Sequence, residues 1–202
     1  MFSIKESLKY GWQKSKENME LALYATLIML AVGWLAGGLS PIGLIILIFM
    51  IIVRIGYTKM FLRIYDGETP KLGDLFKEYK TFWRYLGVSV LFPLVVLCGT
   101  LLLIIPGIIW AIRFSFAPII VIDNKIGPVK SMKESWAITK GGFWKLLMFW
   151  IILAIFNIAG MTFFGIGLLI TIPVSTFASV QIYRTLLQKR ASLIPTTSPQ
   201  TV

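Results

Sequence analysis

The stretch LALYATLIMLAVGWLAGGLSPIGLIILIFMIIVRIGYT, residues 21–58, decides the fold class of this chain. It lies between Glu20 and Lys59 and contains one charged residue, Arg54. Its 38 residues are too many for one ordinary membrane span, because a helix needs roughly 20 to cross about 30 Å of hydrocarbon. Two helices with a tight turn fit better, and GGLSPIG at 37–43 supplies the residues that break helices. The stretch therefore predicts a transmembrane helical hairpin.

Two further blocks have the same length and the same character. Residues 85–122 contain one charge, Arg113, and residues 146–183 contain none. Their midpoints again carry Gly or Pro, in LLLIIPGI at 101–108 and FFGIGLL at 163–169. The sequence thus predicts an all-α integral membrane protein with six transmembrane helices arranged as three hairpins.

Composition agrees with a membrane protein. Apolar residues make up 57% of the chain and charged residues 14%, and the mean hydropathy is +0.81, whereas soluble domains are more polar. The formal net charge of +11 is not a nucleic-acid signature here, because the basic residues lie between long apolar blocks rather than on one soluble face. Membrane topology explains their placement, and no nucleic-acid partner is expected.

The distribution of Lys and Arg predicts the orientation. The three expected hairpin turns carry no charge, and basic residues outnumber acidic ones in every connecting segment, namely 1–20, 59–84, 123–145 and 184–202. The positive-inside rule places such segments in the cytoplasm. We therefore expect a multi-pass protein of the cytoplasmic (inner) cell membrane with both termini in the cytoplasm.

Similar basic motifs precede the three blocks: SIKES at 3–7, LFKEY at 75–79 and SMKES at 131–135. Apolar residues recur at helical spacing around each motif, for example at Ile4, Leu8 and Trp12. Each motif is interpreted as an amphipathic surface helix at the cytoplasmic interface, although short Lys/Glu matches can also arise by chance.

One surface helix and one hairpin would form a repeat unit. The chain then reads as a single membrane domain, residues 1–190, with units of about 1–66, 67–123 and 124–190. Residues 191–202 form a polar, proline-containing tail that is expected to be disordered.

The sequence contains no recognisable reaction chemistry. Histidine is absent and Cys98 is the one cysteine, so disulfides, histidine metal sites and Cys/His nucleophile pairs are excluded by count. The apolar blocks also lack a carboxylate pair or a Ser/His pair. We expect a protein that is not an enzyme, with no catalytic residues, no metal and no cofactor.

The two intramembrane arginines differ in expected depth. Arg54 lies about 14 residues past its turn, roughly 21 Å by helical rise, so its side chain can snorkel to the inner interface. Arg113 lies about 9 residues past its turn, roughly 14 Å, which is close to the midplane. A cation at that depth costs about 2.5–3.5 kcal/mol on insertion scales, so Arg113 requires compensation.

No Asp or Glu lies in the apolar blocks, so the compensating groups must be neutral or bound. Thr171 and carbonyls freed by Pro93 and Pro173 lie at similar depth. Arg113 could therefore be a polar staple between helices, a site for an anion such as a lipid phosphate, or a snorkelling side chain. The candidates for anion or lipid binding are Arg113, Asn157, Ser175, Thr176 and Arg54.

A family resemblance is carried by PGIIWAIRFSFAPIIVIDNKIGPVKSMKESWAITKGGFWKLL at 106–147 and by GYTKMFLRIYDGETPKLGDLF at 56–76. The chain resembles poorly characterised prokaryotic membrane proteins, namely the YciC-like proteins and the membrane domain of some glycerophosphoryl diester phosphodiesterases. This resemblance implies a polytopic helical protein of the cytoplasmic membrane. It does not imply catalysis, because the soluble phosphodiesterase domain with its acidic and histidine metal ligands has no counterpart here.

Two function classes remain open. The first is a non-enzymatic membrane protein that interacts with anionic lipids or membrane partners, a second copy of itself included, through basic surface helices and an intramembrane arginine. The second is a transporter or channel for an anionic small molecule. A cavity open to one side would favour lipid binding, and a continuous polar path would favour transport.

Overall fold

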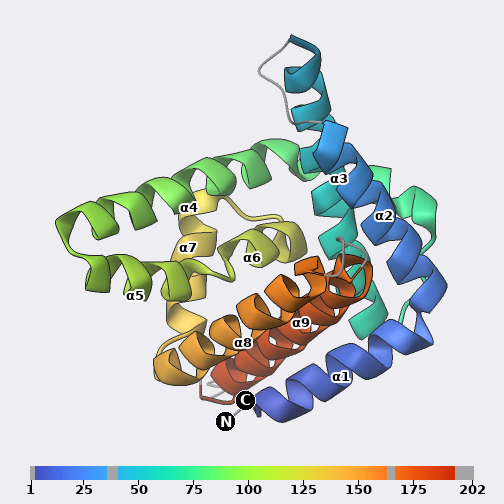
Figure 1. Cartoon of the computed structure of the whole chain (residues 1–202). Coiled ribbons are helices and arrows are strands. Elements are labelled where there is room, and N and C mark those ends of the chain that lie inside the picture. Colours follow the sequence, from blue (N-terminus) through green and yellow to red (C-terminus); the bar gives the residue numbers. More distant parts are fainter. Residues whose placement is uncertain (1–2, 36–40, 163–166, 194–202) are drawn as a thin grey trace, which may run out of the picture.

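The computed structural model describes residues 3–35, 41–162 and 167–193, and within these ranges the chain is helical and contains no strand (Figure 1). The helices in chain order are α1 (Ile4–Glu17), α2 (Met19–Leu35), α3 (Pro41–Tyr65), η1 (Leu72–Phe76), η2 (Tyr79–Thr81), α4 (Phe82–Leu102), α5 (Ile104–Phe114), α6 (Ala117–Asn124), α7 (Pro128–Ile138), α8 (Phe143–Thr162) and α9 (Leu168–Leu193). The all-α prediction is confirmed for the described residues.

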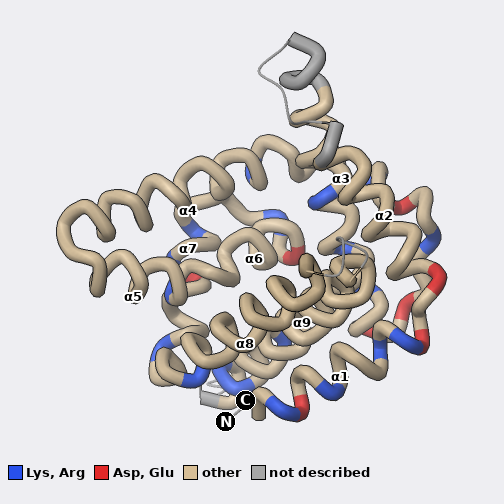
Figure 2. Tube along the Cα trace, viewed as in Figure 1, with Lys and Arg blue, Asp and Glu red and all other residues tan. Residues whose placement is uncertain are grey.

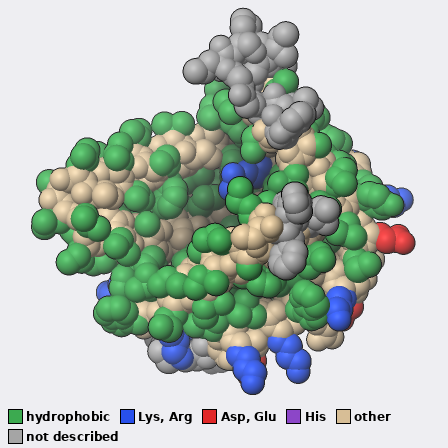
Figure 3. All heavy atoms as spheres, viewed as in Figure 1, with side chains coloured by type: hydrophobic (Ala, Val, Ile, Leu, Met, Phe, Trp, Pro, Cys, Tyr) green, Lys and Arg blue, Asp and Glu red, His purple; other side chains and the backbone are tan. Residues whose placement is uncertain are grey.

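Apolar length supports a membrane location. Among the described residues, three segments are long and apolar enough to cross a membrane, namely Leu72–Leu102, Ile104–Asn124 and Phe143–Thr162, and a shorter apolar helix covers Met19–Gly33. The face of the molecule drawn in Figure 3 is largely hydrophobic. Leu102 and Ile105, near the α4–α5 turn, are 73% and 72% exposed, which suits a lipid environment.

The second hairpin reverses where the sequence predicts. Leu103 is extended (φ −164°, ψ 143°) and separates α4 from α5, within the expected turn at 101–108. Gly99 and Gly107 let the two helices approach closely, because a side chain at Gly99 would meet the Trp110 ring at 2.7 Å. Figure 1 shows this pair extending to one side of the molecule.

The other two turns are only partly described. Helix α3 begins at Pro41 and α9 begins at Leu168, which agrees with helix breaks near the expected midpoints. Residues 37–40 of the predicted turn at 37–43, residues 163–166 of that at 163–169, and tail residues 194–202 lie outside the described residues. Pro93 and Pro173 lie inside α4 and α9, as the block boundaries require.

Helix α1 forms at the first basic motif, but it makes its closest contact through small residues and not through the expected apolar face. Ser7, Gly11 and Ser15 are buried, and a Cβ at Gly11 would meet the Val174 carbonyl oxygen on α9 at 2.5 Å. Trp12, from the expected apolar face, is 45% exposed. Small residues spaced four apart therefore set this contact, since they let two helix backbones approach.

The α-helix expected around LFKEY at 75–79 is wrong. This segment forms the short 3-10 helices η1 and η2 instead. Asp74 accepts a hydrogen bond from the Lys71 backbone N–H (3.0 Å), and the Leu75 backbone packs directly on Gly56 of α3. These local contacts hold the chain against α3 and prevent a regular helix from continuing.

The third basic motif forms the expected helix. Helix α7 starts with Pro128 at its first turn after Gly127, and Met132 lies on its buried side. The large buried side chains at the centre of the molecule come from α3, α6, α8 and α9 and include Phe61, Phe116, Phe149, Phe177 and Tyr183.

Candidate lipid-binding cavity

A cavity of about 810 Å³ lies between the helix pairs. Its walls come from α2, α3, α4, α8 and α9 and from the segment around α6. Figure 3 shows the molecule hollowed between the α4–α5 pair and the α2–α3 pair, with basic side-chain atoms visible in the hollow. The polar residues that line the cavity are Arg54, Tyr57, Thr58, Tyr85, Ser115, Asn157, Ser175, Thr176 and Ser179.

The remaining lining is mostly apolar. Met29 and Leu30 on α2, Met50 on α3, and Leu153 and Ile172 on the third hairpin face the same space. A cavity with a polar group and an apolar remainder suits an amphiphilic molecule rather than a purely ionic one.

Hydrogen bonds fix several of the polar lining residues. Asn157 donates from Nδ2 to Ser175 Oγ (2.9 Å) and to the Leu153 carbonyl (2.8 Å), which joins α8 to α9. The Tyr57 and Thr26 hydroxyl oxygens lie 3.0 Å apart, which joins α3 to α2. Asn157 Oδ1 is buried without a hydrogen-bond partner among the described residues, so this polar group is not fully satisfied internally.

Arg54 provides the positive charge of the cavity. Its side chain is exposed and is a lining residue, and no carboxylate in the described parts of the chain forms an ion pair with it. A guanidinium on an apolar wall favours an anionic group, and phosphate or carboxylate fits its planar set of donors.

Arg113 lies elsewhere. It is not among the lining residues, and its guanidinium carbon is 5.2 Å from the centre of the Trp136 ring on α7. Ser135 and Thr139 donate hydrogen bonds to its backbone carbonyl at 2.7 and 3.3 Å. Arg113 Nε and Nη1 are buried without a hydrogen-bond partner among the described residues.

The structure thus divides the five candidates from the sequence. Arg54, Asn157, Ser175 and Thr176 line one cavity, whereas Arg113 does not join them. The helix break between α5 and α6 explains this, because α5 ends at Phe114 and the Arg113 side chain lies against α7. Thr171 is buried beside Gly160 and does not line the cavity either.

An ion-pair network that the sequence reading missed lies next to the cavity. Arg184 donates from Nη1 to Asp123 Oδ2 (2.7 Å) and from Nη2 to Asp123 Oδ1 (3.2 Å) and Asp66 Oδ2 (2.6 Å). Lys59 Nζ is 3.4 Å from Asp123 Oδ1, and Tyr183 donates its hydroxyl to Asp123 Oδ2 at 3.0 Å. The sequence contains a signal for this network, since Lys59, Asp123 and Arg184 are the charged residues that directly follow the three apolar blocks.

A second group of charges holds the segment between α3 and α4. Arg63 lies 3.5–3.6 Å from carboxylate oxygens of Glu68, Asp74 and Glu78, and Lys125 lies 3.1 Å from Glu78. A hydrogen bond from Lys77, then one from the Lys71 backbone N–H, lowers the pKa of Asp74 below its ordinary value. Figure 2 shows charges along α1 and near helix ends, and none at the α4–α5 turn.

The described residues form an all-helical protein with apolar helices and a cavity between its helix pairs, and the comparison with known proteins gives its family. The chain belongs to the uncharacterised protein family UPF0259, whose family model matches residues 72–191. A relative, the UPF0259 membrane protein SG1383 of Sodalis glossinidius (strain morsitans), is 46% identical over 52 residues, which is 26% of this chain. The chain covers about a fifth (21%) of the length of that relative. No solved structure matches the chain.

Proposed function

We propose that this protein is a non-enzymatic polytopic membrane protein that binds an anionic lipid in the cavity beside Arg54. The observation that supports the proposal is one cavity of about 810 Å³ that combines several hydroxyl and amide groups, a larger apolar lining and a guanidinium with no ion-pair partner among the described residues. A lipid has the same division into an anionic headgroup and apolar chains.

The chemistry of each part of the cavity fits such a ligand. The Arg54 guanidinium would bind a phosphate oxygen through charge-assisted hydrogen bonds, which are stronger than neutral ones. The side chains of Ser175 and Thr176 would meet neutral polar groups of the headgroup. Met29, Leu30 and Ile172 would contact an acyl chain, and these contacts would be favourable because the small dispersion attractions of many atom pairs add up.

We also propose the membrane arrangement predicted from the sequence, with six helices in three hairpins and both ends of the chain in the cytoplasm. The ion-pair network supports it: Asp66, Asp123 and Arg184 follow the second helical stretch of the three blocks and meet at one place. Charges that share one network lie at one depth, as a common cytoplasmic side requires.

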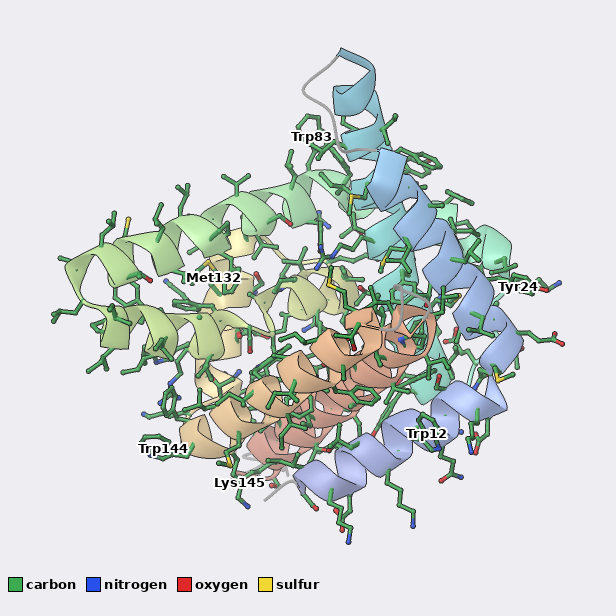
Figure 4. The ribbon with its side chains drawn as sticks, in the orientation of Figure 1. Trp12, Tyr24, Trp83, Met132, Trp144 and Lys145 are labelled. Carbon is green, nitrogen blue, oxygen red and sulfur yellow. The ribbon has the colours of Figure 1, made fainter. Side chains whose placement is uncertain are left out.

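The basic helices α1 and α7 would lie at the inner leaflet in this arrangement. Their lysines would attract anionic headgroups at about 1 kcal/mol each, and the same surfaces could meet a membrane-protein partner or a second copy of the chain. Figure 4 shows Trp12 and Trp144 near the basic parts of the molecule, where interfacial aromatic residues are expected. We also keep as a proposal the resemblance to the YciC-like proteins and to the phosphodiesterase membrane domain.

A transporter or channel for an anionic small molecule is the second candidate. It is supported by the contribution of all three helix pairs to one cavity, since a relative movement of these pairs would change access to it. The apolar blocks lack carboxylates, which argues against ordinary proton or sodium coupling.

Lipid-dependent thermal stability of the purified protein tests the proposal. Wild type should be stabilised more by added phosphatidylglycerol than by phosphatidylcholine, and native mass spectrometry should show the anionic lipid bound. Arg54→Gln should lose most of this difference, and Arg54→Lys should keep part of it, because lysine retains the charge without the planar donors.

Arg113→Gln is the matched control, because it removes the other arginine of the apolar blocks without touching the cavity. It should retain the lipid-dependent stabilisation of wild type. Equal stabilisation of wild type and Arg54→Gln would eliminate the Arg54 site. Retention of a small anion instead of a lipid in the mass spectrum would favour the transport function.

A further inference from the structure

The ion-pair network lies at one end of the cavity. Thr58, Ile122 and Ser179 line the cavity, and each belongs to a different helix pair. Lys59 directly follows Thr58, Asp123 directly follows Ile122, and Tyr183 lies one helical turn after Ser179. Each of these three helices therefore carries a cavity-lining residue and, within about one turn of it, a residue of the network.

Asp123 is the centre of this network. Both of its oxygens are engaged, by two nitrogens of Arg184, by Lys59 and by the Tyr183 hydroxyl. Its side chain is 8% exposed, and those of Lys59 and Arg184 are 19% exposed. Such weakly hydrated charges depend on one another, because water compensates little for a lost partner.

The network also balances its charges across the three helix pairs. Lys59 comes from α3 and Asp66 directly follows that helix, Asp123 comes from α6, and Arg184 comes from α9. Two positive and two negative groups thus link the three helix pairs at one end of the cavity. Separation of the helices at the charged end requires that these ion pairs break.

We infer that the network of Lys59, Asp66, Asp123 and Arg184 closes the cavity on the cytoplasmic side and controls access to it from there. The identity of the ligand and the cytoplasmic side of the closure rest on the proposed function, but the closure of the cavity by the network does not. In the closed state the route past Ser179 is blocked by paired charges. Loss of the Asp123 carboxylate leaves Lys59 and Arg184 facing each other with Asp66 alone, and their repulsion favours an open route.

Cysteine accessibility measures this closure whatever ligand the cavity binds. A Ser179→Cys reporter is placed in a Cys98→Ser background, and inside-out membrane vesicles receive a charged, membrane-impermeant methanethiosulfonate. The reporter should react slowly in the otherwise unchanged protein. Adding Asp123→Asn should raise the rate by about tenfold, which corresponds to about 1.4 kcal/mol of closure free energy.

Asp74→Asn is the matched control, because Asp74 forms ion pairs with Lys77 and Arg63 but belongs to neither the network nor the cavity lining. It should leave the reaction rate unchanged. An unchanged rate in folded Asp123→Asn would overturn the closure, as would an equal rise in Asp74→Asn. If Asp123→Asn does not fold, Asp66→Asn takes its place and is judged by the same criterion, since it removes the more exposed carboxylate of the network.

Failure of this test is distinct from failure of the proposed function. A faster reaction in Asp123→Asn together with absent lipid-dependent stabilisation would support the closure and refute the lipid site. The opposite pair of results would keep the lipid site and refute the closure.

Discussion

Arg184 and Asp123 form a bidentate ion pair, although they lie 61 positions apart in the chain. The Nη1–Oδ2 distance is 2.7 Å and the Nη2–Oδ1 distance is 3.2 Å. A guanidinium and a carboxylate in this geometry are both strongly held and specific in direction. The pair fixes the end of α6 to α9, and Lys59 adds α3 to the same carboxylate. Charges that bound the apolar blocks in the sequence therefore become the polar link between those blocks in space.

Asp123→Asn should lower the free energy of unfolding by about 1–3 kcal/mol, because it leaves two weakly hydrated cations with one partner fewer. Thermal unfolding in a mild detergent measures the change. Glu17→Gln is the comparison, since the Lys14–Glu17 pair is exposed and an exposed ion pair contributes little to stability. A similar loss in both variants would show that Asp123 has no special structural role.

Gly56→Ala should destabilise the protein by about 1–3 kcal/mol, because a Cβ there would collide with the Leu75 backbone, which cannot move as a side chain can. Gly73→Ala provides the control, because nothing lies within 4 Å of its added Cβ. Both substitutions are read by thermal unfolding. Equal stability of the two variants would mean that η1 does not pack on α3 as described.

The sequence predicted the features that depend on apolar length and on helix-breaking residues. The α4–α5 reversal at Leu103 and the helix start at Pro41 follow from such local rules. The 3-10 turns around Leu75 do not, because they depend on contacts with Gly56, a residue from another helix. Periodicity alone could not reveal that contact.

The candidate site shows the same limit. Depth along the chain predicts that Asn157, Ser175 and Thr176 lie close together, and the structure places all three beside one cavity on the two helices α8 and α9. Depth did not predict the direction of a side chain around its helix. Distance from a turn gives the expected membrane depth of Arg113 and Arg54. Their contacts depend instead on how α5 is oriented against α7 and how α3 is oriented against the cavity.

The carboxylate of Asp74 should make stability depend on acid pH. Its pKa is lowered in the folded protein by the hydrogen bonds from Lys77 and from the Lys71 backbone N–H. A lowered folded pKa contributes stability above the unfolded pKa of about 3.9, and this contribution is lost as pH falls through the folded pKa. The difference in unfolding temperature between wild type and Asp74→Asn should therefore shrink as the pH is lowered from 6 towards about 3. A constant difference over that range would refute the role of the Asp74 charge.

The three-hairpin arrangement predicts which positions are reachable from outside the cell. Leu103 lies at the α4–α5 turn and is 69% exposed, so Leu103→Cys in a Cys98→Ser background should react with an impermeant maleimide added to intact cells. Lys130 lies on α7 and is exposed in the structure, yet Lys130→Cys should react only after the membrane is permeabilised, because α7 is assigned to the cytoplasmic side. Both positions are exposed in the structure, so the expected difference in labelling comes from the opposite sides of the membrane to which they are assigned. Labelling of Lys130→Cys in intact cells, or protection of Leu103→Cys until permeabilisation, would contradict the proposed orientation.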